Sequence, residues 1–415
     1  MYRRNASKGD AKRMKNRKSF FGGLLVGVAV TILINAPILG YLGVRKVGFS
    51  KYGFTKEEEI RVDGKLKQIV AYLDRYYVNG VDKKKLIEGT YAGLVAGVGD
   101  PYTVYYDEES FERLKVETEG TYAGIGVIVS IDPEDQLVTI VSPFIGGPGE
   151  KAGLLPGDKI IEVNNIDVTG KKLDDIVSMI KGPEGTKVSL KIFRKSNNDV
   201  FNADLRRAKI DVPTVAHEML DGDIGYLKIT GFDQVTYKQF MDAYKDLQQQ
   251  GQKGMIIDVR NNPGGLLHIV AKIADEILPE GLIVYTEDKE GRREEIRSDD
   301  TKKIQVPLVI LVNGNSASAS EILAGSIKDH RVGTLVGTTT FGKGLVQNII
   351  DLEDGTALKV TTSKYYTPNG THIQDIGIEP DYIVELPEEL NHKIQLEPEE
   401  DLQLQKAIQV IREQL

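Results

Sequence analysis

The spacing of apolar residues changes along the chain and marks off four regions. Apolar positions recur at helical spacing in residues 55–115, alternate in short runs through 119–209, and form strand-like runs followed by helix-like runs through 210–385. Residues 386–415 are acidic and end in a helical stripe of apolar positions. The pattern predicts a multidomain chain of mixed α/β (α+β) class, with a small helical unit, a β-rich unit, an α/β unit and a C-terminal helix.

A stretch of 25 residues without a charged side chain, residues 20–44, precedes these regions. A helix of that length crosses a hydrocarbon core of about 30 Å, so the stretch is predicted to be a transmembrane signal anchor. Basic side chains crowd residues 1–19, which favours a cytoplasmic tail there and a single-pass protein of the cell membrane with an extracytoplasmic body. A cleavable signal peptide is the alternative, but the apolar run exceeds a signal core and no A-x-A-like site follows it.

The net charge of -8 and the absence of cysteine narrow the classes of function. Because basic residues gather at the amino terminus, the rest of the chain is acidic and offers no surface for the phosphate backbone of a nucleic acid. Without cysteine there can be neither disulfides nor zinc sites with thiolate ligands. A chain of 415 residues is also too long for one hydrophobic core, which agrees with several domains.

The predicted C-terminal helix carries an apolar face made of Leu404, Ile408, Ile411 and Leu415. Such a stripe more often packs on a neighbouring surface than stays exposed. The sequence does not decide whether that surface belongs to the same chain or to a second subunit, so a homodimer stays open.

Residues 119–209 contain short β-type runs separated by glycine turns, with one helical run, and predict a small, partly open barrel. The segment resembles a PDZ domain, since KAGLLPGDKIIEVNN matches that family's A-G-L-x-x-G-D-x-I-x-x-V-N run. The positions of the family's carboxylate-binding loop are occupied by Gly124, Ile125, Gly126 and Val127. The resemblance implies that backbone N–H groups capture a peptide's free carboxyl terminus while the peptide adds as a strand to the sheet edge. The alternative is that the glycines only permit a tight turn.

Small residues crowd residues 313–322, NGNSASASEI, between an apolar run and a helical pattern. A serine at such a junction lies beside unpaired N–H groups and the positive end of the helix dipole, and both stabilise an oxyanion. Ser318 with Glu321 also matches a capping box, which needs no catalysis. Spacing and composition leave open whether Ser318 is a nucleophile or a cap, and which of Ser316, Ser318 and Ser320 would attack.

Lys343 lies 25 residues after Ser318, between two glycines in a weakly polar stretch, TTTFGKGLVQ. Burial there would disfavour the ammonium form and lower the pKa of Lys343, as a base for a serine hydroxyl requires. Gln347, four residues further on, could hold the amine through its amide oxygen. An exposed turn residue is the alternative interpretation of a lysine between glycines.

A predicted strand ends in the run DVRNNPGG, residues 258–265. Because glycine has no side chain, the backbone N–H groups of Gly264 and Gly265 can approach a ligand closely. One of them could therefore donate a hydrogen bond to an oxyanion. An ordinary turn would use the same residues.

Six stretches in this order resemble the carboxyl-terminal processing peptidases, also called tail-specific proteases, over residues 55–385. They are DPYTVYY, the PDZ-like segment, DVRNNPGG, NSASASEI, FGKGLVQ and YYTPNGTHIQDIGIEPD. The resemblance implies a ββα protease core like that of Clp-type peptidases and crotonases, with the PDZ domain inserted after an N-terminal helical domain. It also implies a serine endopeptidase that recognises protein tails, forms an acyl-enzyme and uses neither a metal nor an organic cofactor.

The same resemblance implies roles for individual residues. Ser318 would be the nucleophile, Lys343 the general base, and Gln347 the residue that orients the lysine. The oxyanion hole would be formed by the backbone N–H groups of Ala319 and of Gly264 or Gly265. We expect the substrates to be proteins or peptides with free, apolar carboxyl-terminal tails.

Other functional classes fit the sequence less well. None of the five histidines lies in a triad motif, and no G-x-S-x-G elbow occurs. His217-Glu218 lacks the second histidine of a zinc-protease helix, and Gly344 stands where a phosphate-binding loop has Ser or Thr. A non-catalytic membrane receptor that binds protein tails through the PDZ-like segment is the remaining alternative, which the presence of Ser318, Lys343 and Gln347 argues against.

Overall fold

The computed structural model describes residues 52–299, 304–390, 396–397 and 399–415. The predicted transmembrane segment, 20–44, and the basic tail before it lie outside the described residues. Within the described part, no helix combines the length and the apolar character that a membrane crossing needs. The chain divides into two compact units, Met1–Ile87 and Glu88–Leu415, which are described separately.

Two helices occupy most of the predicted helical region. Helix α2 (Lys56–Tyr76) begins with a capping box, in which Thr55 Oγ1 accepts the Glu58 N–H and the Glu58 side chain accepts the Thr55 N–H. Helix α3 (Lys83–Ala96) follows and crosses from the first unit into the second. Neither α2 nor α3 has a buried residue.

The end of the predicted helical region contains a strand, which the spacing of apolar residues did not predict. Strand β1 (Val104–Tyr106) pairs with β18 (Ala357–Tyr366), which lies far along the chain. Helix α4 (Glu108–Glu119) then begins at the capping side chain of Asp107 and ends at Gly120 in the left-handed conformation, with φ 64°. Three residues of strand show no periodicity, and their partner is remote in sequence, so the pattern could not reveal them.

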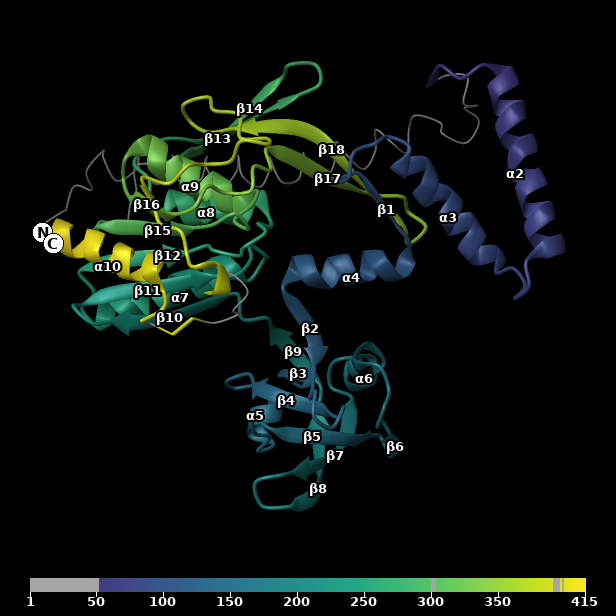
Figure 1. Ribbon diagram of the computed structural model, residues 1–415, viewed down its shortest axis with the longest axis horizontal. Coiled ribbons are helices and arrows are strands. Elements are labelled where there is room, and N and C mark those ends of the chain that lie inside the picture. Colours follow the sequence, from purple (N-terminus) through teal and green to yellow (C-terminus); the bar gives the residue numbers. More distant parts are fainter. Residues whose placement is uncertain (1–51, 300–303, 391–395, 398) are drawn as a thin grey trace, which may run out of the picture. The chain divides into compact units, whose positions relative to one another are not determined.

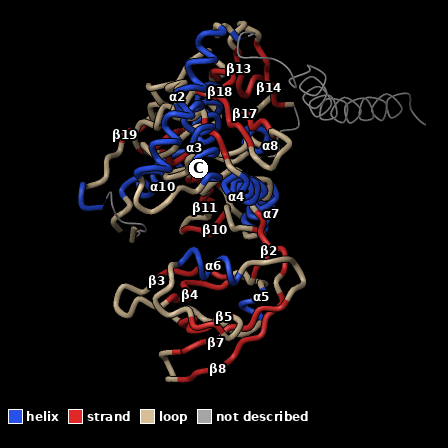
Figure 2. The backbone as a smooth tube through the Cα atoms, turned by 90° about the vertical axis from the view of Figure 1, so that its right-hand side faces the viewer, coloured by secondary structure: helices blue, strands red, loops and turns tan. Residues whose placement is uncertain are grey.

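The PDZ-like segment forms an antiparallel sheet in the order β3-β4-β5-β7-β8, with β6 paired to β5. Its elements are β3 (Val127–Ile131), β4 (Val138–Pro143), α5 (Pro148–Lys151), β5 (Asp158–Val163), β6 (Ile166–Asp167), α6 (Leu173–Ile180), β7 (Lys187–Arg194) and β8 (Asp199–Arg206). Alternate residues of β7, namely Val188, Leu190 and Ile192, are buried, as the sequence pattern predicts. Figure 2 shows the strands in this order, which leaves β3 as an edge strand.

A two-stranded ribbon joins the PDZ-like segment to the rest of the chain. Strand β2 (Thr121–Gly124) runs antiparallel to β9 (Ala208–Asp211), and Thr121 faces Asp211 across the pair. The chain therefore enters and leaves the segment at neighbouring points, as expected for a domain inserted into another.

The α/β region is built on a six-stranded sheet of order β10-β11-β12-β15-β16-β19. The strands are β10 (Val215–Leu220), β11 (Ile224–Ile229), β12 (Gly254–Asp258), β15 (Leu308–Val312), β16 (Thr334–Gly337) and β19 (Tyr382–Ile383). β10 is antiparallel to β11, and the other neighbours are parallel. Every residue of β12 and β15 is buried, as in parallel strands that are covered on both faces.

Helices cover both faces of this sheet (Figure 1). They are α7 (Thr236–Gln249), α8 (Leu267–Asp275) and α9 (Ala319–His330) on one face, and α10 (Leu402–Gln414) on the other, after a 3-10 turn, η3 (Glu388–Leu390). Helix α10 buries Ala407, Val410 and Ile411, whereas Leu415 of the predicted stripe is exposed. The tail thus docks on its own chain, and its apolar face needs no second subunit to cover it.

A second sheet has the order β1-β18-β13-β14, with β17 also paired to β18. Its remaining strands are β13 (Gly281–Asp288), β14 (Arg293–Ser298) and β17 (Leu345–Asp351). Strands β17 and β18 agree with the strand-like runs expected within residues 210–385. Because β1 and β17 both pair with β18, this sheet brings the residues just before β1 close to Lys343, just before β17.

Candidate active site

Ser318 stands at the turn from strand β15 to helix α9. Its backbone adopts φ 55° and ψ −112°, outside the regions that L residues commonly populate. Such strain persists only where the surroundings fix the backbone, and it clusters at functional sites. The Ser318 side chain is half-buried, although its neighbours Ala317 and Ala319 are buried. The turn therefore presents the serine instead of packing it into the core.

The other two serines of this turn are engaged in structure. Ser316 and Ser320 are fully buried. Ser316 Oγ donates to the Val259 carbonyl oxygen (2.7 Å), and Ser320 Oγ donates to the Asn262 carbonyl oxygen (2.9 Å). Both hydroxyls hold the turn against the loop after β12. Of the three serines that the sequence left as alternatives, Ser318 is the accessible one.

The carboxylate of Glu321 ties the Ser318 turn to the Lys343 loop. It is fully buried and accepts the backbone N–H groups of Ser318 (2.8 Å) and Lys343 (2.9 Å). It also accepts the Gly342 N–H (2.7 Å) and the Thr340 hydroxyl (2.6 Å). The Glu321 N–H donates to the Ser318 carbonyl oxygen (2.9 Å), and the bond from the Ser318 N–H to the Glu321 carboxylate is the one expected of a capping box. Four donors on one buried carboxylate fix the two backbones relative to each other.

Tyr365, on β18, joins the same two backbones from the other side. Its ring is buried, and its hydroxyl donates to the carbonyl oxygens of Ser318 (3.0 Å) and Lys343. Burial raises the pKa of Tyr365 well above its usual range, and the charge of Glu321 acts in the same direction. The phenol therefore stays protonated and remains a donor.

Lys343 is half-buried, and its amine is easier to deprotonate than a free lysine. Burial lowers the pKa of Lys343, and the charge of Lys359 lowers it further. The charges of Asp100 and Glu321 act against this change but do not cancel it. The direction agrees with the prediction from the weakly polar, glycine-rich stretch.

The polar partners expected for the Lys343 amine are not in contact with it. Within the described part of the chain, Nζ makes no hydrogen bond to the Ser318 hydroxyl or to the Gln347 amide. Gln347 Nε2 instead donates to the Thr361 hydroxyl (3.4 Å). Lys343 Nζ lies 4.6 Å from the ring centroid of Tyr102. The structure thus joins the backbones of Ser318 and Lys343 and leaves their side chains without a mutual hydrogen bond.

Three residues of this cluster, Glu321, Tyr102 and Tyr365, had no catalytic role predicted from the sequence. Glu321 was interpreted only as a cap, and Tyr102 and Tyr365 were given no role. Each of them lies inside one of the six stretches that carry the family resemblance, which is the signal that could have found them.

The two glycines after β12 approach Ser318 closely. Gly264 has φ +105°, and a Cβ atom there would lie 2.9 Å from Ser318 Cβ. Gly265 has φ +146°, and a Cβ atom there would lie 2.3 Å from the Phe232 carbonyl oxygen. Only glycine fits either position.

The N–H groups of the predicted oxyanion donors differ in their partners. The Gly264 N–H donates to Asn262 Oδ1 (2.9 Å). The N–H groups of Gly265 and Ala319 have no hydrogen-bond partner among the residues that the structure describes. Ala319 is also the first residue of α9, where the helix dipole favours negative charge. These two N–H groups are therefore available to a ligand, whereas that of Gly264 is not.

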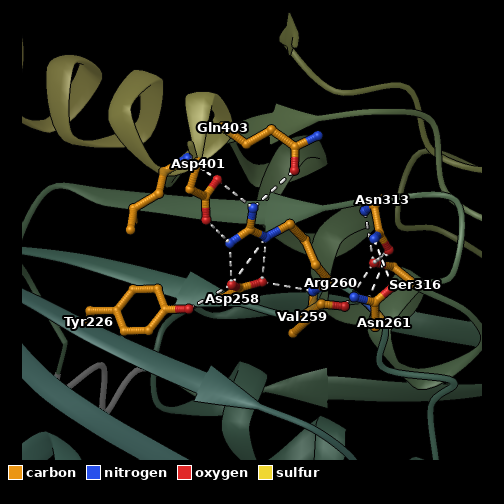
Figure 3. Close-up of polar contacts among 10 residues, drawn as sticks. Tyr226, Asp258, Val259, Arg260, Asn261, Asn313, Ser316, Asp401 and Gln403 are labelled. Atoms are coloured by element: carbon orange, nitrogen blue, oxygen red, sulfur yellow. Dashed lines mark hydrogen bonds and ion pairs between the residues drawn. The ribbon is translucent and has the colours of Figure 1, made fainter. Parts of the chain in front are cut away.

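A buried ion-pair network holds the loop that carries these glycines (Figure 3). Asp258, at the end of β12, accepts the Tyr226 hydroxyl (2.7 Å) and Arg260 Nη2 (2.7 Å). Arg260 Nη1 and Nη2 donate to the two carboxylate oxygens of Asp401 (2.8 Å each), and Nη1 also donates to Gln403 Oε1 (3.0 Å). Asp401 is the N-cap residue of α10. The C-terminal helix is thus bonded directly to the loop beside Ser318.

The same loop is bonded to the Ser318 turn by an amide pair (Figure 3). The Asn261 N–H donates to Asn313 Oδ1 (2.9 Å), and Asn313 Nδ2 donates to Asn261 Oδ1 (3.0 Å). Asn261 has a positive φ of 58°, a conformation that asparagine tolerates. The two hydrogen bonds between Asn261 and Asn313 fix the loop after β12 relative to the Ser318 turn.

The PDZ-like loop predicted to bind a carboxylate precedes the edge strand β3. Gly126 has φ 67°. The carbonyl oxygens of Ile125 and Gly126 accept the N–H groups of Gly149 (2.7 Å) and Phe144 (2.8 Å). Among the described residues, the N–H groups of Ile125 and Gly126 have no partner. Two adjacent free donors at the start of an edge strand suit a terminal carboxylate.

Three family models match the chain. The model for peptidase family S41 matches residues 223–384, the PDZ domain model matches 139–194, and the model for the N-terminal domain of the activating protease CtpB matches 46–110. The PDZ match begins after Gly124–Val127, so the assignment of the binding loop rests on the geometry described above.

Individual proteins are similar over most of the chain. The carboxyl-terminal-processing protease of Synechocystis sp. is 35% identical over 401 residues, which cover 92% of each chain. The carboxy-terminal processing protease CtpA of Bacillus subtilis is 35% identical over 377 residues, 89% of this chain and 78% of that one. Among solved structures, the photosystem II D1 C-terminal processing protease is 30% identical, with a TM-score of 0.45, and the alignment covers 77% of this chain and 87% of that chain.

The α/β core, the inserted PDZ domain and the serine turn define a serine-type peptidase that acts on proteins or peptides. The chain belongs to the carboxyl-terminal processing proteases of peptidase family S41. The expectation from the six sequence stretches is therefore confirmed at the level of the family.

Proposed function

We propose that this protease is an endopeptidase that cleaves by a Ser/Lys mechanism, with Ser318 as nucleophile and Lys343 as general base. Neutral Lys343 takes the Ser318 hydroxyl proton while Oγ forms a bond to the scissile carbonyl carbon. The tetrahedral intermediate then expels the amine, which receives that proton from the lysine. In the second half-reaction, Lys343 takes a proton from a water molecule while the water oxygen bonds to the acyl carbonyl carbon. Ser318 Oγ then leaves with that proton from the lysine, which releases the second product. Gln347 orients the amine in the active arrangement.

The oxyanion of the intermediate is bound by the N–H groups of Ala319 and Gly265. Both groups lack partners within the described residues, and Gly264 packs against Ser318, which supports this assignment over one that uses the Gly264 N–H. Donors that are fixed before the reaction stabilise the developing charge without reorganisation.

The PDZ domain selects the substrate by its tail. The free N–H groups of Ile125 and Gly126 bind the terminal carboxylate, and the tail adds beside β3 through Val127. The loop starting at Gly124 thus favours chains with a free, apolar carboxyl terminus.

The protein is anchored in the cell membrane by residues 20–44, with its catalytic part outside the cytoplasm. The length of the uncharged stretch and the basic residues before it support this proposal. A full-length chain with a C-terminal tag should resist alkaline extraction from membranes, and an added protease should remove the tag from intact protoplasts. Extraction at alkaline pH, or a protected tag, would contradict the topology.

The proposed mechanism rests on one observation: the side chains of Glu321 and Tyr365 each form hydrogen bonds with the backbones of both Ser318 and Lys343. The test is cleavage of a peptide that ends in free apolar residues, beside the same peptide with an amidated end. Ser318→Ala and Lys343→Ala should each lower kcat/KM by more than about a thousandfold.

Two matched variants serve as controls for this test. Ser326→Ala removes a buried hydroxyl that, among the described residues, bonds only within its own helix, to the Leu323 carbonyl oxygen (3.0 Å). Lys238→Ala removes an exposed lysine. Both should keep near wild-type rates, and full activity of Lys343→Ala would refute the proposed base.

A further inference from the structure

A turn that the proposed mechanism does not use lies against the Lys343 amine. Residues 100–103 connect α3 to β1, and the Asp100 carboxylate accepts the Tyr102 N–H (3.0 Å) and the Thr103 hydroxyl (2.6 Å). Thr103 Oγ1 in turn accepts the Thr361 N–H on β18 (3.1 Å). With the pairing of β1 to β18, these bonds hold the turn in a fixed position beside the site.

Two features of this turn attract a cation. The face of the Tyr102 ring lies 4.6 Å from Lys343 Nζ, within the range of a cation–π interaction. Burial raises the pKa of Asp100, but the hydrogen bonds of Thr103, Thr361 and Tyr102 and the charge of Lys343 outweigh it, so the pKa is lowered. Asp100 is therefore a carboxylate at neutral pH.

The charged groups around Lys343 come from three elements. Asp100 on the turn and Glu321 on α9 attract the ammonium form, whereas Lys359 on β18 repels it. The face of an aromatic ring attracts an ammonium ion more strongly than a neutral amine. A general base, in contrast, has to be neutral before it can take a proton. The contact with Tyr102 thus favours the ammonium form of Lys343, whereas the proposed catalysis requires the neutral amine.

We propose that Tyr102 and Asp100 form a resting dock that holds the protonated Lys343 side chain away from the Ser318 hydroxyl and releases it when the amine loses its proton. The proposal rests on the proposed function, in which Lys343 is the base. It accounts for the amine facing Tyr102 with no hydrogen bond to Ser318 within the described residues. Tyr102 is on this view a positioning residue, since it acts through Lys343.

The test is the pH profile of kcat/KM for the full chain with Tyr102→Leu, beside Tyr102→Phe as the control. Leucine keeps an apolar side chain and removes the aromatic face, whereas phenylalanine keeps the face. In Tyr102→Leu the acidic limb should move to lower pH, so that the rate on the limb rises about three- to tenfold over wild type. Tyr102→Phe should follow the wild-type profile.

Other outcomes of this experiment decide against the dock. An unmoved limb in Tyr102→Leu, with or without a lower plateau, would mean that Tyr102 has a structural role only. A limb that moves equally in Tyr102→Phe would mean that the aromatic face is not responsible. If Tyr102→Leu does not fold, Asp100→Asn serves instead, since loss of that charge should also move the limb to lower pH.

Failure of this inference can be told apart from failure of the proposed function. Labelling of Ser318 by a fluorophosphonate and turnover of the peptide are measured in Lys343→Ala in parallel. If Lys343→Ala remains active, the base assignment is wrong, whatever Tyr102 does. If Lys343→Ala is inactive and the Tyr102→Leu profile equals that of wild type, the dock alone is wrong.

Discussion

The ion pair between Asp401 and Arg260 connects the C-terminal helix α10 to the loop that carries Gly264 and Gly265, and Asp401→Ala removes it. The change takes away two charge-assisted hydrogen bonds of 2.8 Å. It also removes the side chain that caps α10, because Asp401 Oδ1 accepts the Leu404 N–H (2.9 Å). We expect the sheet to open more easily around β12 and the protease to lose activity.

The size of the effect follows from burial. Asp401 is 6% exposed and the Arg260 side chain 11%, so water replaces the lost bonds poorly. Breaking a buried pair costs about 3–5 kcal/mol, and losing a cap costs about 1 kcal/mol. Arg260 keeps its second partner, Asp258, so the charge is not left alone. A local destabilisation of about 3 kcal/mol is therefore expected.

Hydrogen exchange measured on peptides from residues 254–265 tests this value in the full chain, because it reports local opening in a protein of several domains. The control is Asp242→Ala, which breaks an exposed pair with Lys238 and should cost less than about 1 kcal/mol. Equal exchange in the two variants would refute the reasoning.

The pH dependence gives a second check on the same pair. Burial raises the pKa of Asp401, but the hydrogen bonds and charge of Arg260 outweigh it and leave the pKa lowered. The stability that Asp401 adds is therefore present above its unfolded pKa, about 3.9, and is lost as the pH falls through the folded value. The difference between wild type and Asp401→Ala should accordingly shrink in acid.

Three further predictions concern the site itself. Gly264→Ala places a Cβ atom 2.9 Å from Ser318 Cβ at a φ of +105°, so kcat should fall at least about a hundredfold. Binding of a tail peptide, measured by fluorescence anisotropy, should stay unchanged. Glu321→Gln replaces a carboxylate that accepts four hydrogen bonds by an amide whose NH2 group donates, so we expect loss of activity and a local stability of α9 about 2 kcal/mol lower, measured by hydrogen exchange. Wild-type activity and exchange would mean that Glu321 does not hold the site together. Lys343→Met should raise the thermal midpoint at pH 7, because the lowered pKa of Lys343 means that the ammonium form is less stable in the folded than in the unfolded chain. This gain should vanish as the pH rises toward the pKa of lysine in the unfolded chain, about 10.4.

Local patterns predicted the elements that bury a regular face. The alternation in β7 and the continuous apolar run of β15 are visible in the sequence, and both are buried as expected. The small residues around Ser318 likewise indicated a strand-to-helix turn. Contacts between remote segments were not predictable in this way, because no spacing rule links β1 with β18.

The candidate active site likewise combines features that local sequence patterns indicated with contacts that they did not. Residue type and surroundings pointed to the serine turn of residues 316–320 and to Lys343, and spacing from the lysine pointed to Gln347, whereas the choice of Ser318 among the three serines came from the family resemblance. Glu321 and Tyr365 join the two loops by bonding to backbone groups, so residue type and spacing did not indicate this role, although both residues lie within the stretches that carry the family resemblance. The strained φ of Ser318 is also a result of these contacts, so no local propensity could indicate it.

The ribbon of β2 and β9 has a consequence for how such proteases diversify. Since Thr121 lies opposite Asp211, the ends of the PDZ domain are close enough for a short hairpin to replace it. Another domain with similarly spaced ends could be grafted there while the strand order around Ser318 stays the same. The inserted PDZ domain and the α/β core are thus separable parts, open to independent exchange.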